Sequence, residues 1–370
     1  MNKATNPRIP RFDALTALRG LAAWWVVLFH FKRFLAPHLP AAIMQVIGHG
    51  ELAVDVFFCL SGFVIYLSYQ QVDLRDQPGI WRFYLKRFAR IYPLHLVILV
   101  AYVGLVGVLF FGARSPLDSR YSAGAFLANL VLVQDWGILS ELTWNIPAWS
   151  ISAEMAAYLL FPVLLYCLAL DRASTLRIGL TMLGLVALIA AVFVPFNSEL
   201  GRGVATVGTL RCILEFAAGM LTGELFLRNQ GTKWNGLAIT AILCGLGGFA
   251  LCLWRGLPSA NCIPLSACLA ILGIAGLHGH EWRGAGRWFV VAGEISYSTY
   301  MCHYFILDSF KLLLVREDGI ASTAKLIGAF AAVAVSSFIA YYWIERPAQT
   351  WLLETFEPGR RSPLITVVGA

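Results

Sequence analysis

The feature that most constrains this chain is an apolar run of about twenty residues that recurs along nearly its whole length. A helix needs ~20 mostly apolar residues to cross a bilayer. By that measure about ten spans are expected, starting near Ala14, Leu52, Phe88, Pro147, Ile178, Thr209, Gly236, Cys262, Val290 and Lys325. Of 370 residues, 59% are hydrophobic and only 13% are charged, whereas soluble domains are about a quarter charged. The chain is therefore expected to be all-α, a polytopic membrane helix bundle.

One apolar stretch is too short to cross. The segment "SAGAFLANLVLVQD", between the third and fourth expected spans, is expected to be re-entrant or interfacial. There is neither an internal repeat nor a loop long enough for a soluble domain. We therefore expect a lead-in at residues 1–12, a single transmembrane domain at 13–347 and a tail at 348–370.

The net charge of +7 invites a search for nucleic acid as a partner. Membrane proteins are basic for another reason, because lysine and arginine hold cytoplasmic loops inside. Outside the expected spans, about two thirds of the basic residues fall on the loops that share a side with the N-terminus. This predicts a multi-pass protein of the plasma (inner) membrane with both termini cytoplasmic, and no nucleic-acid partner.

Arg19 and His30 are the ionisable residues of the first span. Their separation of eleven residues is close to three full turns, so both project from one helix face, roughly 16 Å apart along the axis. Arginine is permanently cationic and suits an anionic ligand, while histidine can take and return a proton near neutral pH. The alternative is that Arg19 reaches the membrane surface and His30 makes a structural hydrogen bond.

Polar residues also interrupt the second span, "VDVFFCLSGFVIY". Ser61 and Gly62 would let another helix approach closely, which is a packing role. Asp55 is harder to explain by packing, although it could simply pair with a neighbour.

A basic cluster opens the third span in "WRFYLKRFARIYP". Lys86, Arg87 and Arg90 lie within about one and a half helical turns, followed by Tyr92 at the membrane surface. Anchoring by the positive-inside rule would explain any one of them. Clustered guanidinium groups also suit the binding of phosphate.

The fourth span, "WSISAEMAAYLLFP", begins with Trp149 and carries a polar stripe. Ser150, Glu154 and Tyr158 follow one another at intervals of four residues. A carboxylate in this position needs a partner, so Glu154 is expected to orient His30 or to bind a hydroxyl group.

Three further groups lie in later spans. Arg211 and Glu215, four residues apart, are expected to neutralise each other in part. Ser296, Tyr300 and His303 share a face of the ninth span, and the Glu345–Arg346 pair looks like a stop signal at the inner membrane surface.

Taken in order, these segments resemble the acyltransferase 3 family of integral membrane acyltransferases, which modify cell-surface glycans. The first span is similar to the family's Arg-x10-His helix, and "VFFCLSGFVI" to its FF-LSGF segment. "KRFARIYP" resembles its arginine-rich motif, with Lys86 where an arginine is usual, and "WSISAEMAAYLLFP" resembles the WSLS-x-E segment. "EFAAGM", "ISYSTYMCH" and "ERP" complete the series.

The resemblance implies ten spans, cytoplasmic termini and a cytoplasmic acyl-CoA, with acetyl-CoA foremost, as co-substrate. It implies neither a tightly bound cofactor nor a metal. Some members carry a C-terminal hydrolase-like domain, which this chain is expected to lack, so a separate transferase or polysaccharide-export partner is expected. The acceptor would be a glycan or a lipid-linked saccharide.

The hypothesis is acyl transfer to a glycan hydroxyl, with the named residues in three roles. His30 acts as general base or acyl carrier, supported by Arg19 and Glu154; Lys86, Arg87, Arg90 and Tyr92 hold the acyl-CoA; and Asp55, Ser61, Trp149, Tyr158 and His303 contact the acceptor. The alternative function is a proton-coupled exporter of a sugar or lipid-linked substrate, which would also use intramembrane Arg, His and Glu.

Overall fold

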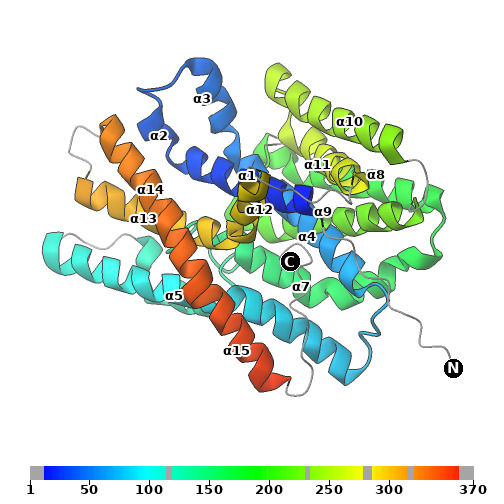
Figure 1. Cartoon of the computed structure of the whole chain (residues 1–370), viewed down its shortest axis with the longest axis horizontal. Coiled ribbons are helices and arrows are strands. Elements are labelled where there is room, and N and C mark those ends of the chain that lie inside the picture. Colours follow the sequence, from blue (N-terminus) through cyan, green and yellow to red (C-terminus); the bar gives the residue numbers. More distant parts are fainter. Residues whose placement is uncertain are drawn as a thin grey trace.

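The computed structural model describes residues 12–113, 119–197, 199–229, 234–277, 286–314 and 321–357, and all regular structure in these ranges is helical (Figure 1). The α-helices are α1 (Asp13–His30), α2 (Lys32–Leu35), α3 (Ala41–Gly48), α4 (Ala53–Tyr69), α5 (Gln77–Ala113), α6 (Ala123–Leu130), α7 (Ala148–Leu168), α8 (Thr175–Phe193), α9 (Val204–Arg228), α10 (Trp234–Arg255), α11 (Ser259–Gly276), α12 (Gly286–Glu294), α13 (Ser296–Leu314), α14 (Thr323–Ala340) and α15 (Arg346–Phe356). A π-helical turn, Tyr341–Glu345, joins α14 to α15.

Helix length and hydropathy confirm the polytopic character. Within the described residues, eight helical stretches are long and apolar enough to cross a membrane. The first and ninth expected spans are not among them, although both are helical: α1 has 18 residues and α13 has 19. These are the helices that carry Arg19, His30 and His303.

Three expected spans differ from the structure in their bounds, the sixth least, because α9 begins at Val204 rather than near Thr209. The third begins at Gln77 rather than near Phe88, so α5 is 37 residues long and includes the whole basic cluster. The ninth is broken at Ile295, between α12 and α13. The short apolar segment forms α6, eight residues long, which confirms that it cannot cross a bilayer.

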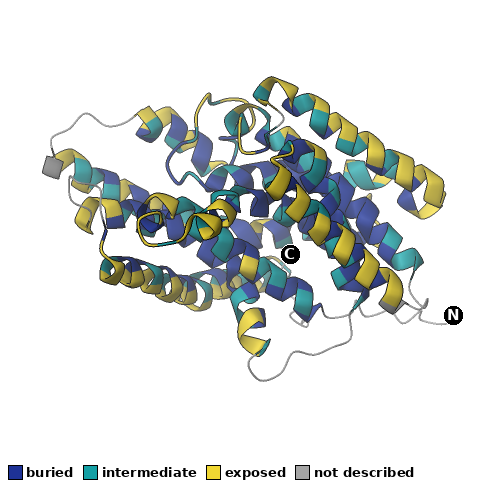
Figure 2. Cartoon of the chain, turned by 90° about the horizontal axis from the view of Figure 1, so that it is seen from above, coloured by how far each residue is buried: buried dark blue, intermediate teal, exposed yellow. Residues whose placement is uncertain are grey.

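Burial follows a membrane pattern rather than a water-soluble one. Buried residues concentrate in the centre of the bundle, and the outer helix faces are exposed (Figure 2). Those outer faces carry many large apolar side chains, among them Val100, Leu183, Leu243 and Val335. Because lipid tails surround such side chains, their exposure costs nothing in a bilayer.

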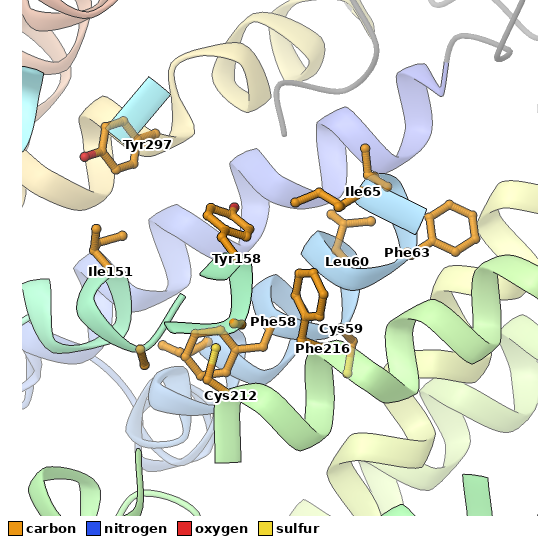
Figure 3. Close-up of a cluster of buried hydrophobic side chains, with 14 of the residues drawn as sticks. Phe58, Cys59, Leu60, Phe63, Ile65, Ile151, Tyr158, Cys212, Phe216 and Tyr297 are labelled. Atoms are coloured by element: carbon orange, nitrogen blue, oxygen red, sulfur yellow. The ribbon is translucent and has the colours of Figure 1, made fainter. Parts of the chain in front are cut away.

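A very close helix contact in the centre joins α4 to α9. A Cβ atom at Gly62 would lie 1.9 Å from the carbonyl oxygen of Phe216, and one at Gly219 would lie 1.9 Å from that of Cys59. Only glycine permits backbones to approach this closely. Figure 3 shows the side chains of Phe58, Leu60 and Phe216 packed around this contact. The packing role of the Ser61–Gly62 pair therefore belongs to Gly62, which leaves Ser61 to face another helix.

The two ends of the described chain lie at the same end of the bundle. Phe12, just before α1, packs against Phe63 in the later part of α4. α4 ends at Tyr69 beside the start of α5, where Arg82 forms an ion pair with Glu357 after α15. Two chain ends on the same side of a membrane require an even number of membrane crossings.

The lead-in at residues 1–12 lies outside the described residues except for Phe12, as does the tail beyond Glu357. The first residues of the expected tail belong to the helix α15, which ends at Phe356 (Figure 1).

Candidate active site

A pocket lies among α1, α4, α5, α7 and α13 and encloses about 720 Å³ of space free of atoms, part of it open to the outside. One wall is apolar and is formed mainly by α4. The polar residues that line it are Arg19, Ser61, Arg90, Ser150, Glu154, Tyr158, Ser296, Tyr297 and Tyr300. Residues from five separate parts of the sequence thus converge on one hollow, including two of the three predicted catalytic residues.

Arginine side chains gather at one end of the pocket. Arg19 and Arg90 line it, and the guanidinium of Arg87 lies 5.8 Å from the ring centre of Tyr158, another lining residue. The Nη1 of Arg19, and the Nε and Nη1 of Arg87, are buried and have no hydrogen-bond partner among the described residues. Buried donors are normally satisfied, so these groups are suited to receive an anionic ligand.

Glu154 lines the pocket and lies in a network of hydroxyl groups. Its Oε1 accepts hydrogen bonds from Ser61 Oγ at 2.6 Å and from the Tyr158 hydroxyl at 2.5 Å. In Figure 3 the hydroxyl of Tyr158 points away from Phe58 and Phe216. Of the two expectations for Glu154, the structure shows contact with hydroxyl groups; its hydrogen bonds do not reach His30.

His30 lies beyond the pocket, in contact with the predicted acceptor residue His303. The Nδ1 of His30 is 3.0 Å from the Nε2 of His303 and 3.1 Å from the carbonyl oxygen of Val26. His303 is fully buried. Tyr300, one turn before His303 on α13, lines the pocket. The histidine pair therefore continues the line of the pocket by one helical turn without lining it.

Three other predicted residues lie outside the pocket lining. Asp55 is fully buried and accepts hydrogen bonds from Arg211 at 2.9 and 2.5 Å, so it pairs with a neighbour. The ring of Trp149 lies 5.8 Å from the same guanidinium. Glu215 also forms an ion pair with Arg211, at 3.5 Å, which confirms that these two residues neutralise each other in part, although Asp55 is the closer partner.

The remaining residues of the basic cluster are also separate from the pocket. Tyr92 donates a hydrogen bond to the carbonyl oxygen of Leu130 at 3.0 Å and stacks on Phe88, so it holds α6 against α5. Lys86 is half-buried and is not a lining residue.

Sequence reasoning missed Glu345, which is not merely part of a stop signal. It is 1% exposed, forms an ion pair with Arg90 and accepts a hydrogen bond from Ser298 Oγ at 2.5 Å. Glu345 is the last residue of the π-helical turn, which directs its side chain into the bundle. Such turns often occur at functional sites. A buried acidic residue at the end of a span was the available signal.

Asp135, in the irregular segment after α6, was also missed. It is 1% exposed, and Thr209 Oγ1 donates hydrogen bonds to its backbone carbonyl at 2.6 Å and to its Oδ2 at 3.3 Å. Burial raises the pKa of Asp135 to about 8, and the Thr209 hydrogen bond and the charge of Arg211 oppose that rise. It joins the short segment to α9.

Residues 12–346 match the model of an acyltransferase domain family, acyltransferase 3. The chain is 30% identical to the acyltransferase MdmB of Streptomyces mycarofaciens, over 97% of this chain and 96% of that protein. It is 29% identical to the exopolysaccharide production protein ExoZ of Rhizobium meliloti (80% and 89%) and 24% identical to the O-acetyltransferase OatA of Staphylococcus aureus (91% and 57%). No solved structure matches the chain. These matches support an enzyme rather than an exporter, and the chain thus belongs to the acyltransferase 3 family and is a multi-pass membrane O-acyltransferase.

Proposed function

We propose that the protein transfers an acyl group, acetyl in the first instance, from cytoplasmic acyl-CoA to a hydroxyl of a cell-surface or exported glycan. The observation that carries this proposal is the set of buried guanidinium nitrogens of Arg19 and Arg87, beside the pocket, that have no hydrogen-bond partner within the described part of the chain. Counting Arg19, Arg87 and Arg90 against Glu154 and Glu345, three cations face two anions. The surplus of positive charge favours a phosphorylated ligand.

The order of residues along α13 indicates how this ligand would be oriented in the pocket. Tyr297 lies beside Arg90, with 5.5 Å between ring centre and guanidinium. Tyr300 follows one turn later in the pocket wall, and His303 one turn after that, against His30. CoA phosphates held at the arginine end would let the extended pantetheine arm follow this line, with the thioester toward His30.

The chemistry required is modest because a thioester is already activated. His30 would remove the proton of the acceptor hydroxyl, or carry the acyl group itself. Arg19 and the neighbouring arginines would hold the donor in position. The names of two relatives, an O-acetyltransferase and an exopolysaccharide production protein, favour acetyl as the acyl group and a glycan as the acceptor.

The function is tested in a deletion strain complemented with variants, by mass spectrometry of its surface glycans. The wild type should restore acyl groups that the deletion loses, and His30→Ala should not. Arg19→Gln should lower acylation about tenfold or more, because one charge-assisted contact contributes ~1.4 kcal/mol or more.

The matched control is His38→Ala, an exposed histidine beyond α2, which should retain full acylation. Membrane levels of every variant are measured by immunoblot. Full acylation by His30→Ala would remove His30 from the mechanism, and unchanged glycans in the deletion strain would exclude a surface glycan as acceptor.

A further inference from the structure

The contact between His30 and His303 has a direction that can be deduced from the groups around it. A neutral imidazole has one N–H donor and one bare nitrogen that accepts. The two rings meet through His303 Nε2 and His30 Nδ1, 3.0 Å apart. One of these nitrogens must therefore carry the hydrogen.

The second ring nitrogen of His303, Nδ1, shows which tautomer this residue adopts. Its Nδ1 lies 2.7 Å from the carbonyl oxygen of Tyr300 and 3.3 Å from that of Thr299. A carbonyl oxygen can only accept, so Nδ1 of His303 carries the hydrogen and Nε2 of the neutral ring is bare.

The surroundings of His30 give the matching result. Its Nδ1 faces two acceptors, the bare Nε2 of His303 and the carbonyl oxygen of Val26 at 3.1 Å. Nδ1 of His30 therefore carries the hydrogen and donates to both. The nitrogen left with a free lone pair is Nε2 of His30.

We propose that His303 is a positioning residue that holds His30 in the tautomer with Nε2 free and accepts part of the positive charge when Nε2 takes a proton. This rests on the proposed function. The hydroxyl O–H bond of the acceptor breaks and its proton moves to Nε2, while its oxygen bonds to the thioester carbon. The carbon–sulfur bond then breaks, and the proton passes from Nε2 to the departing CoA sulfur.

His303 is a neutral hydrogen-bond acceptor for the general base His30, and a neutral acceptor suits a site within a membrane. In soluble hydrolases a carboxylate has this role, and it brings a buried negative charge. A bare imidazole nitrogen orients the base without that charge, which is costly to bury. The tautomer would be fixed at little electrostatic cost.

Few other titratable groups face His30. The ring of Tyr304 lies 5.0 Å away, centre to centre. Lys32 and Lys311 are charged groups that act electrostatically on His30; Lys32 lies over the ring of Phe29, and Lys311 donates to Asp308 at 3.2 Å. Among the described residues, no carboxylate is hydrogen-bonded to His30.

The test measures His30 directly, without acyl-CoA or acceptor. The full-length protein in lipid nanodiscs is treated with diethylpyrocarbonate, which modifies unprotonated imidazole, and His30 modification is followed against pH by mass spectrometry. His303→Gln keeps an acceptor, His303→Leu removes it, and His303→Glu supplies a carboxylate. Exposed His38 in the same molecules is the internal reference.

The expected order of the His30 pH midpoints follows from how well the side chain at position 303 stabilises the protonated ring of His30. Relative to wild type, the pH midpoint of His30 should fall by about one unit in His303→Leu, stay close in His303→Gln and rise by about one unit in His303→Glu. The His38 midpoint should not change. The Gln and Glu variants decide the matter even if the Leu variant does not fold.

Two results would overturn the inference: equal His30 midpoints in all variants, or a wild-type His30 that resists the reagent at every pH. Acetyl transfer from acetyl-CoA is then measured, with kcat expected to fall in His303→Leu while KM stays unchanged. If the midpoints follow the expected order but wild-type protein transfers no acetyl group, the proposed function fails and the tautomer assignment stands.

Discussion

Single residues around the pocket show where reasoning from the sequence reaches its limit. The eleven-residue spacing of Arg19 and His30 placed both on one helix face, but it could not reveal that only Arg19 lines the pocket. Likewise, the i, i+4 rule suggested Glu215 as the partner of Arg211, whereas Asp55, 156 residues away, binds it more closely. Periodicity predicts the side of a helix, but partners on other helices depend on the packing of the bundle.

At Glu345, the prediction concerns the position of Arg90. Glu345→Gln removes the negative charge that holds this arginine at the pocket wall. We expect the KM for acyl-CoA to rise about tenfold, equivalent to ~1.4 kcal/mol, and a lower melting temperature because a buried cation loses its partner. Steady-state kinetics and thermal unfolding in detergent measure these effects. Glu354→Gln, on the exposed side of α15, is the control, and equal KM values in both variants would contradict the positioning of Arg90 by Glu345.

At Asp135, the prediction concerns pH. The pKa of about 8 means that the folded protein holds a proton which the unfolded chain releases near pH 4. The stability from this group is therefore full below about pH 4 and is lost as pH rises toward 8, by up to ~1.4 kcal/mol per pH unit. Asp135→Asn should flatten this dependence and should stabilise the protein at pH 8 relative to wild type. Melting temperatures from pH 5 to 8 test it; parallel profiles would show that Asp135 is already ionised at pH 5.

At the level of helices, hydropathy predicted the starts of most spans to within a few residues, as with α1, α4 and α7. It could not predict that α5 begins before its apolar part, because the basic cluster is amphipathic and is stabilised by contact with α15. Nor could it predict the break at Ile295 or the π-helical turn, since both depend on neighbouring helices. In Figure 1, α14 and α15 form a nearly continuous rod across α5, with the π-helical turn at their junction.

The close contact of α4 and α9 yields a prediction of its own. Gly62→Ala would place a methyl group 1.9 Å from the carbonyl oxygen of Phe216, so the helices must separate. We expect little folded protein, or a melting temperature lower by about 1–4 °C or more, because overpacking typically costs ~1–3 kcal/mol or more. Gly104→Ala on α5, where an added Cβ has no neighbour within 4 Å, should be neutral. Size-exclusion profiles and thermal unfolding compare the two, and equal stability would mean that the backbones are farther apart.

For the whole molecule, the two described ends of the chain share one end of the bundle, which makes topology testable. Together with the distribution of basic residues, this predicts that both termini face the cytoplasm. Reporter fusions should be fluorescent with GFP and inactive with alkaline phosphatase at either terminus. An active phosphatase at one terminus only would require an odd number of crossings and would contradict the shared end.

α1 and α13, the two polar helices, have a consequence for biogenesis. Neither is apolar enough to partition into lipid readily by itself, and α1 packs chiefly on α12 and α13. Because α1 precedes α12 and α13 by more than 250 residues in the chain, it waits for residues near 290–310 before its charged side chains are sheltered. Until then, a nascent chain exposes them to lipid or to the insertion machinery, so chains that stop before this region should be cleared by membrane proteases instead of persisting as partial bundles.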